Sequence, residues 1–316
     1  MELAGLLSYL VFFLCFVGIY ALLSLGLNVQ FGFAGMFNIG IAAFFAVGAY
    51  ASAILTSPDN PNHIGGFGLP LPIGFLAAMV LSAALAWCIG LITLTLRSDY
   101  LAIASIGIAE IVRLFLKNED WLTNGVRGIP GIPRPFGEMA QGSGDLVFLV
   151  LLAVTLGIAF LAVERAWISP WGRALRALRE NEVAAVAMGK SSFSFRMQAF
   201  VLGAALMGLA GAFYAHFVGF ISPEAFDPMF ATFLVWVMLI AGGSGNNRGA
   251  LLGALVIWGV WSGTEILIGR LPAEIVTQAG ALRVFLIGLL LVAILLFRSE
   301  GILAERPPEP LDRDQD

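Results

Sequence analysis

The chain has 316 residues, of which 59% are hydrophobic and only 12% are charged. Soluble domains carry about 25% charged residues, so a water-soluble fold of this composition would leave much apolar surface in water. The apolar runs are continuous and long, whereas a membrane β-barrel alternates in segments of about ten residues. We therefore predict an all-α, polytopic membrane helical bundle. The net charge of −4 gives no indication of a nucleic-acid partner.

About nine apolar segments follow one another along the chain, which predicts about 8–10 membrane spans. They cover roughly residues 5–27, 38–55, 72–96, 100–116, 146–164, 198–219, 229–242, 249–269 and 281–297. The segments at 38–55, 100–116 and 229–242 are short and rich in glycine, alanine or polar residues. We expect some of them to be broken or re-entrant helices, which survive at membrane depth only inside protein or beside a water-filled cavity.

Glycines and amides interrupt the apolar pattern directly after the first segment. The stretch NVQFGFAGMFNIG contains Asn28, Gln30 and Asn38 and ends at Gly40. This composition predicts a helix break near the membrane midplane or its inner edge, where a substrate path could use the freed backbone groups. Asn28, Gln30, Asn38 and Gly40 are therefore candidate pathway residues. The alternative is a simple tight turn.

Charged residues inside spans are functional candidates because burying a charge in a bilayer is costly. Glu110 lies in SIGIAEIVRLF, one helical turn before Arg113, and is a fifth candidate pathway residue. The alternative, which we favour for this pair, is a local i, i+3 ion pair near the outer interface. Glu265, in WSGTEIL, has no local partner, and it either reaches outward or faces a cavity.

The longest charged interruption runs from Ser169 to Arg196, and the stretch that begins at Arg165 holds over a third of the 17 basic residues. We predict a short helix here. Ser169 suits an N-cap, Pro170 suits the first helical position, and Gly189 suits the residue just beyond the helix. The alternative is a solvated loop that only follows the positive-inside rule.

Lysine and arginine set the expected orientation. Basic residues mark the expected cytoplasmic side at Arg97, at 165–196, at Arg248 and from Arg298 onward. The loops 56–71 and 220–228 carry no Lys or Arg and are placed outside. The loop 117–145 must then also be outside, although it carries basic residues. We divide the chain into a transmembrane domain at 1–300, with a cytoplasmic loop inside it, and a polar cytoplasmic tail at 301–316.

Small residues recur at helical spacing in two later segments. They are Ala204, Gly208, Gly211 and Ala215 in one segment and Gly249 and Gly253 in another. Helices in lipid associate by close backbone approach, so these positions predict packing faces.

Residue types that carry chemistry are sparse. His63 and His216 have no cysteine or carboxylate at ligand spacing, so we predict no metal site. Cys15 and Cys88 are expected to be buried apolar residues without a disulfide. No GxSxG or HExxH motif appears, and the GKS at 189–191 lacks the first glycine of a P-loop. We predict no catalytic residue, no cofactor and no ATPase within this chain.

Three stretches of the chain together match the pattern of a known family. They run from Leu25 to Leu55, from Leu96 to Pro133 and from Trp171 to Phe226, the last followed by GGSGNNRGALLGA. In this order they resemble the M-type (LivM-like) permease subunits of branched-chain amino acid ABC importers. The string Arg-Glu-Asn-Glu-x-Ala-Ala-x-x-x-Gly is the most specific, being similar to the loop that such permeases insert into their ATPase partner. The resemblance implies a coupling helix whose ATPase-coupling residues are Arg176, Arg179, Glu180, Asn181, Glu182, Ala185 and Gly189.

The resemblance also implies several partner chains. These are a periplasmic substrate-binding protein, a second permease subunit that completes a heterodimer, and two cytoplasmic ABC ATPase subunits. This chain would be a multi-pass protein of the bacterial inner membrane, with a cytoplasmic C-terminus and no enzymatic activity of its own.

The substrate implied by the resemblance is a branched-chain or other aliphatic amino acid. Many relatives carry polar residues where this chain has Met36 and Ile41, so a urea, amide or other amino acid importer stays an alternative within the family. Outside the family, the alternative is an ion-coupled transporter or channel, which would be expected to place more ionisable residues at membrane depth.

Overall fold

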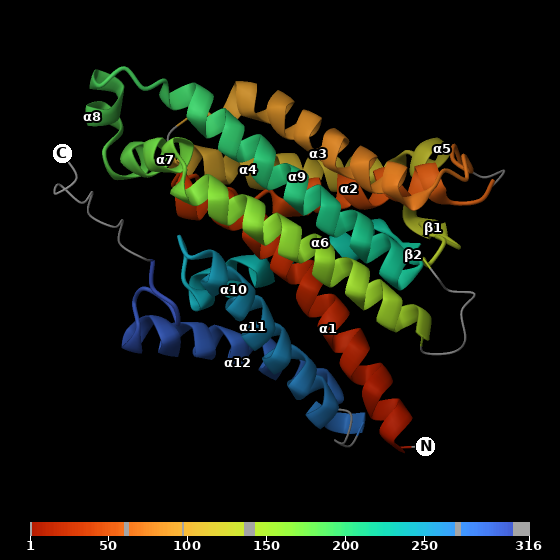
Figure 1. Cartoon of the computed structure of the whole chain (residues 1–316). Coiled ribbons are helices and arrows are strands. Elements are labelled where there is room, and N and C mark those ends of the chain that lie inside the picture. The colour runs from red at the N-terminus through yellow and green to blue at the C-terminus, as the bar shows by residue number, and fades with distance from the viewer. Residues whose placement is uncertain (1, 60–62, 97, 136–142, 269–272, 306–316) are drawn as a thin grey trace.

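The computed structural model describes residues 2–59, 63–96, 98–135, 143–268 and 273–305 (Figure 1). The long helices are α1 (Glu2–Leu27), α2 (Ile41–Thr56), α3 (Leu71–Thr93), α4 (Ser98–Asn118), α6 (Ser143–Ile168), α9 (Ser192–Val218), α11 (Asn247–Ile268) and α12 (Ala273–Phe297). The shorter helices are α5 (Asp120–Thr123), α7 (Pro170–Glu180), α8 (Glu182–Ala187) and α10 (Leu234–Gly242). The remaining elements are the π-helical turns η1 (Asn28–Phe33) and η4 (Met229–Phe233), the 3-10 turns η2 (Gly125–Arg127) and η3 (Pro223–Phe226), and the strands β1 (Ile129–Pro130) and β2 (Phe220–Ile221). Arg97 and the tail residues 306–316, both used in the sequence argument, lie outside the described residues.

The all-α membrane bundle is confirmed. Among the residues that the structure describes, four helical stretches are long and apolar enough to cross a membrane: Gly5–Phe33, Leu71–Thr93, Gly144–Ile168 and Ser192–Val218. Shorter apolar helices cover Ile41–Thr56, Met229–Gly242 and Ala281–Phe297. Of the three segments in which breaks were expected, 229–242 begins in the π-turn η4 and 38–55 becomes helical only at Ile41, but 100–116 lies inside the unbroken α4. The charged side chains of α4, and not a break, account for its reduced apolar character.

Helix α9 lies at the centre of the main layer, where it packs on α1, α2 and α3 (Figure 1). A Cβ atom on Gly48 of α2 would overlap the backbone of Gly208, and one on Gly211 would overlap the carbonyl of Phe45. A Cβ atom on Gly253 would overlap the carbonyl of Met238 in the same way. The predicted small-residue faces are therefore the close contacts that hold α9 to α2 and α11 to α10.

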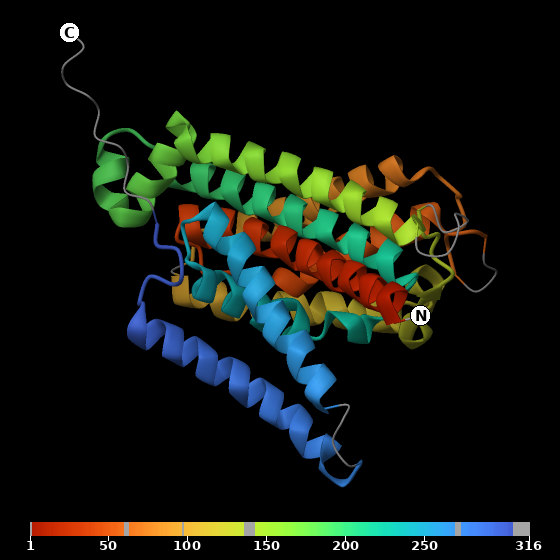
Figure 2. The same ribbon diagram turned by 60° about the horizontal axis from the view of Figure 1, so that its bottom comes forward.

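Helices α10, α11 and α12 form a second group beside α1 (Figure 2). α11 packs on α1 and α10, and α12 packs on both α10 and α11. Cys15 is buried in α1 as predicted, but Cys88 is exposed on α3, so the prediction for Cys88 was wrong. The reason is that α3 lies at the edge of its layer and turns only one face toward α2 and α9.

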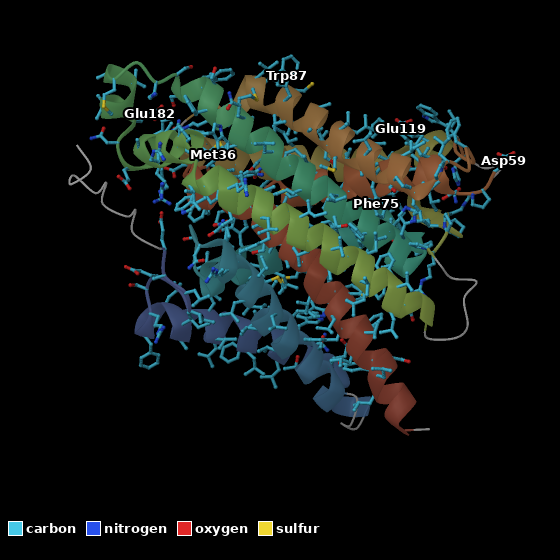
Figure 3. The ribbon with its side chains drawn as sticks, in the orientation of Figure 1. Met36, Asp59, Phe75, Trp87, Glu119 and Glu182 are labelled. Atoms are coloured by element: carbon cyan, nitrogen blue, oxygen red, sulfur yellow. The ribbon has the colours of Figure 1, made fainter. Side chains whose placement is uncertain are left out.

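The loops between the helices lie at the two ends of the bundle, in agreement with the distribution of Lys and Arg along the sequence. Asp59 and Glu119 lie at one end and Glu182 at the other (Figure 3). At the Asp59 end, β1 pairs antiparallel with β2, which joins the loop 117–145 to the connection 220–228. The loop 117–145 carries basic residues, which are unusual for an outside loop. It nevertheless lies at the same end as the loops 56–71 and 220–228, which are expected outside.

Candidate coupling and pathway sites

The charged stretch forms two helices and not the single helix predicted from the sequence. Ser169 caps α7 by accepting a hydrogen bond from the backbone N–H of Gly172, and Pro170 opens the helix, both as predicted. Asn181 ends α7 in an extended conformation, and its Oδ1 accepts from the backbone N–H of Ala184 at 3.0 Å, which caps α8. Asparagine favours such caps over helix interiors because its side chain competes for backbone hydrogen bonds.

Gly189 lies just beyond the end of α8, as predicted. Gly189 has a φ of 78°, and its N–H donates to the carbonyl of Val186 at 2.9 Å. The N–H of Lys190 donates to the carbonyl of Ala185 at 3.1 Å. These two bonds form a Schellman motif, in which glycine is favoured because the conformation is left-handed. Asn181 and this motif therefore cap the two ends of α8, and Ser191 then caps α9.

The two helices differ sharply in burial. The buried residues are Gly172, Ala174, Leu175 and Leu178 on α7 and Ala185 on α8. Val183 is 80% exposed, Met188 is 69% exposed and Val186 is 49% exposed. Glu180 is exposed as well. Helix α8 therefore presents apolar side chains to its surroundings at the tip of the molecule, where Glu182 lies in Figure 3.

Two of the predicted coupling arginines contact their own chain. The Arg176 guanidinium lies over the ring of Trp167, with 4.1 Å between its carbon and the ring centroid. Burial lowers the pKa of Arg176, and the nearby Glu305 carboxylate acts in the opposite direction. Arg179 donates to the backbone carbonyl of Gly32 and to both carboxylate oxygens of Glu305, at 2.8 and 2.9 Å. Both side chains thus attach α7 to the bundle.

Glu182 attaches α8 to α9. Its carboxylate accepts from Ser192 Oγ at 2.5 Å and from the guanidinium of Arg196 at 2.9 Å. The same three residues line one side of a groove of about 590 Å3, and Gly35 and Met36, which follow η1, line another. The groove opens at the end of the bundle that carries α7 and α8.

Three candidate pathway residues meet at the interruption between η1 and α2. The side chain of Gln30 donates to the carbonyl of Phe200 at 2.8 Å and accepts from Asn38 Nδ2 at 2.7 Å. Asn38 Oδ1 accepts from the N–H of Gly40 at 2.8 Å, and Trp236 Nε1 donates to the Asn38 carbonyl at 3.0 Å. The non-helical residues 35–40 exceed the four residues of a tight turn, so the predicted break is confirmed.

Asn28 lies in a second buried cluster. Its Nδ2 donates to Asn247 Oδ1 at 2.9 Å, and its Oδ1 accepts from the N–H of Gly245 at 2.8 Å. Asn247 in turn donates to Glu164 at 2.7 Å, which joins η1, α6 and α11. Neither Asn247 nor Glu164 was predicted as a site residue from the sequence. The sequence signal for Asn247 was the position of a polar residue next to a glycine-rich turn, at the end of a helix.

Glu110 lies apart from both clusters. Arg113 donates to both of its oxygens, at 2.9 and 2.6 Å, and also lies 3.5 Å from Glu224. The ion-pair interpretation is confirmed. Glu265 is paired as well, because Arg283 of α12 approaches it to 3.8 Å. Both carboxylates therefore have a basic partner within the chain.

Comparison with known proteins decides the family. A family described as "Branched-chain amino acid transport system / permease component" matches residues 9–295. The chain belongs to this family. The permease is 32% identical to the high-affinity branched-chain amino acid transport system permease protein LivM of Salmonella typhimurium, over 92% of this chain and 69% of the relative. It is 33% identical to LivM of Escherichia coli over the same shares.

A third relative extends the similarity to a chain of similar length. The permease is 30% identical to the probable branched-chain amino acid transport permease protein LivM of Methanocaldococcus jannaschii, over 93% of both chains. No solved structure matches the permease. The matches confirm the predicted resemblance and the assignment as a permease subunit of an ABC importer.

Proposed function

We propose that this permease carries branched-chain and other aliphatic amino acids into the cell as one half of a heterodimeric pathway. A periplasmic binding protein delivers the amino acid, and two cytoplasmic ABC ATPase subunits hydrolyse the ATP, so that this chain catalyses no reaction itself. The observation that carries the proposal is the similarity to three LivM proteins over nine-tenths of the chain.

The orientation follows from the charge on the two ends. The end that carries α7 and α8 is cytoplasmic, together with the C-terminus, because basic residues concentrate there. The end that carries α5, β1 and β2 is periplasmic. There Arg113 and Lys117 of α4 contact Glu224 at 3.5 and 2.8 Å, which fastens α4 to η3 beneath the surface that receives the binding protein.

Helices α7 and α8 have separate tasks in coupling. Helix α7 is fixed to the bundle by its buried leucines and by Arg176 and Arg179. Helix α8 offers Val183, Val186 and Met188 to a cleft on the ATPase, with Asn181 and Gly189 setting its ends. A rigid element that contacts the ATPase differently in two states transmits its movement to the bundle.

The buried amide side chains fix the backbone of the proposed pathway. Asn28, Gln30 and Asn38 are each 0% exposed and bonded within the chain, so their role is to fix the residues after η1 and not to contact the amino acid. The groove beside Met36 provides the cytoplasmic exit. An apolar side chain such as that of leucine suits these surroundings, since the charged residues in the groove lining, Glu182 and Arg196, pair with each other.

The test is the ATPase activity of the complete assembly reconstituted in lipid. The assembly is titrated with binding protein loaded with leucine, valine or urea, or left empty. We expect stimulation by the leucine- and valine-loaded forms. Stimulation by the urea-loaded form alone would keep the coupling assignment and overturn the substrate, and the absence of any stimulation would overturn both.

A further inference from the structure

The chain does not leave the bundle at the end of α12. Residues 298–305, which we call the C-terminal strap, run back across the turn between α10 and α11. The N–H groups of Ile302 and Leu303 donate to the carbonyls of Ala241 and Gly242, each at 2.9 Å. Part of the segment that the sequence assigned to a polar tail is therefore paired with the bundle backbone.

Glycines allow the strap and the turn to touch. Gly243 has a φ of 117° and Gly301 a φ of 83°, and a Cβ atom on Gly243 would overlap the carbonyl of Leu303. The side chain of Asn246 adds a hydrogen bond to the carbonyl of Ala304 at 2.8 Å. The backbone of the strap is thus fixed up to the residue before Glu305.

This arrangement places the Glu305 carboxylate between the turn and α7. A Cβ atom on Gly245 would lie 2.7 Å from a carboxylate oxygen of Glu305, so a larger residue there would displace the carboxylate from this position. Both oxygens accept from Arg179, whose other terminal nitrogen donates to the carbonyl of Gly32 in η1. The Arg179 and Glu305 side chains are 24% and 30% exposed, so the pair is largely screened from water.

We propose that Glu305 is a positioning residue for energy coupling, which acts by holding Arg179 against η1. The proposal rests on the proposed role of α7 and α8 in binding the ATPase. The contact from Glu305 through Arg179 to Gly32 joins three parts of the chain: the strap, the helix next to the docking element, and the turn that leads into the break. Movement of α7 then reaches residues 34–40 through a charge-assisted contact and not only through apolar packing.

The charges around Arg179 explain why the carboxylate is needed. Arg173 and Arg176 lie on the same helix, and both they and Arg179 carry positive charge. A guanidinium has five N–H donors and no acceptor, so the carbonyl of Gly32 alone leaves most of them unsatisfied. Without the anionic partner, Arg179 is expected to turn toward water, where its remaining donors are solvated, and to release Gly32.

The experiment compares Glu305→Gln with Glu300→Gln in the complete assembly in nanodiscs. Glu300 is an exposed carboxylate of the same strap and serves as the matched control. Hydrogen–deuterium exchange is measured on peptides that cover 34–40 and 298–305, and ATPase stimulation by leucine-loaded binding protein is measured on the same samples. Glu305→Gln should raise exchange in 34–40 by about fivefold or more, the usual lower range of coupling between sites, and should weaken stimulation. Glu300→Gln should change neither.

A double-mutant cycle tests whether Glu305 acts through Arg179. The effect of Glu305→Gln should disappear when Arg179→Gln is already present. Additive effects, or a change in exchange confined to 298–305, would overturn the proposal and leave the strap as a simple fastening. Should wild-type assembly show no stimulation by any loaded binding protein, the proposed function fails, but the exchange in 34–40 still decides whether Glu305 controls the break.

Discussion

Helices α7 and α8 follow one another in the sequence but differ in burial and in their contacts with the rest of the chain. Helix α7 buries one face, and its arginines contact a tryptophan ring, a backbone carbonyl and a carboxylate of the same chain. Helix α8 buries Ala185, exposes two valines and depends on its caps and on Glu182 for its position. The proposed coupling stretch therefore contains two kinds of residue: those that pack on the bundle and those that remain exposed for a partner.

The largest effect should come from the buried face of α7. Leu178 is 1% exposed, so Leu178→Ala removes packed atoms and should cost about 2–5 kcal/mol of stability. The thermal melting midpoint of the purified permease in detergent measures this loss. Val183→Ala on α8 is the matched truncation of an exposed residue and should leave the midpoint unchanged. Equal midpoints for the two variants would remove the distinction between the helices.

The next effect should appear in partner binding and not in stability. Val183→Asp and Val186→Asp place carboxylates on the exposed face of α8, and we expect about tenfold less ATPase retained on the purified permease, as for a central interface residue. Val126→Asp, at the opposite end of the molecule, is the control because Val126 is 60% exposed. Undiminished ATPase recovery with the α8 variants would refute the proposed docking surface.

The sequence predicted the elements better than their partners. The caps at Ser169 and Gly189 were predictable because capping depends on residues close in sequence. The break at Asn181 also depends on residues close in sequence. Asparagine disfavours a helix interior but does not exclude it, so the sequence was compatible with one helix and with two.

The contacts of the candidate sites lie beyond such reasoning. Arg179 meets Gly32 and Glu305 across 147 and 126 positions of sequence, and Asn28 meets Asn247 across 219. The hydrophobic periodicity of a single helix does not predict contacts between residues this far apart in the sequence. The Glu110–Arg113 pair was predictable for the opposite reason, since both residues lie on one turn of the same helix.

A smaller effect should follow from loss of the cap between the two helices. Asn181→Ala removes the side-chain acceptor for the N–H of Ala184 and should destabilise α8 by about 1 kcal/mol, while α7 stays folded. Faster hydrogen exchange in residues 182–188, with no change in 170–180, is the expected result. Asn181→Asp keeps a cap oxygen and should behave like wild type. Faster exchange in both helices would mean that they unfold as one unit.

The smallest change in stability should accompany the reversal of Glu182. Its carboxylate side chain is 46% exposed, and such an ion pair contributes about 0.2–1 kcal/mol, so Glu182→Lys should insert and assemble normally. Leucine uptake should nevertheless fall about two- to fivefold, because a lysine next to Arg196 pushes α8 away from α9 and displaces its exposed valines. Glu180→Lys makes the same charge change within the same stretch, on the exposed end of α7, and serves as the comparison. Uptake that falls equally in both variants would show that the ATPase responds to the net charge of the stretch, and the position of α8 would then carry no separate role in coupling.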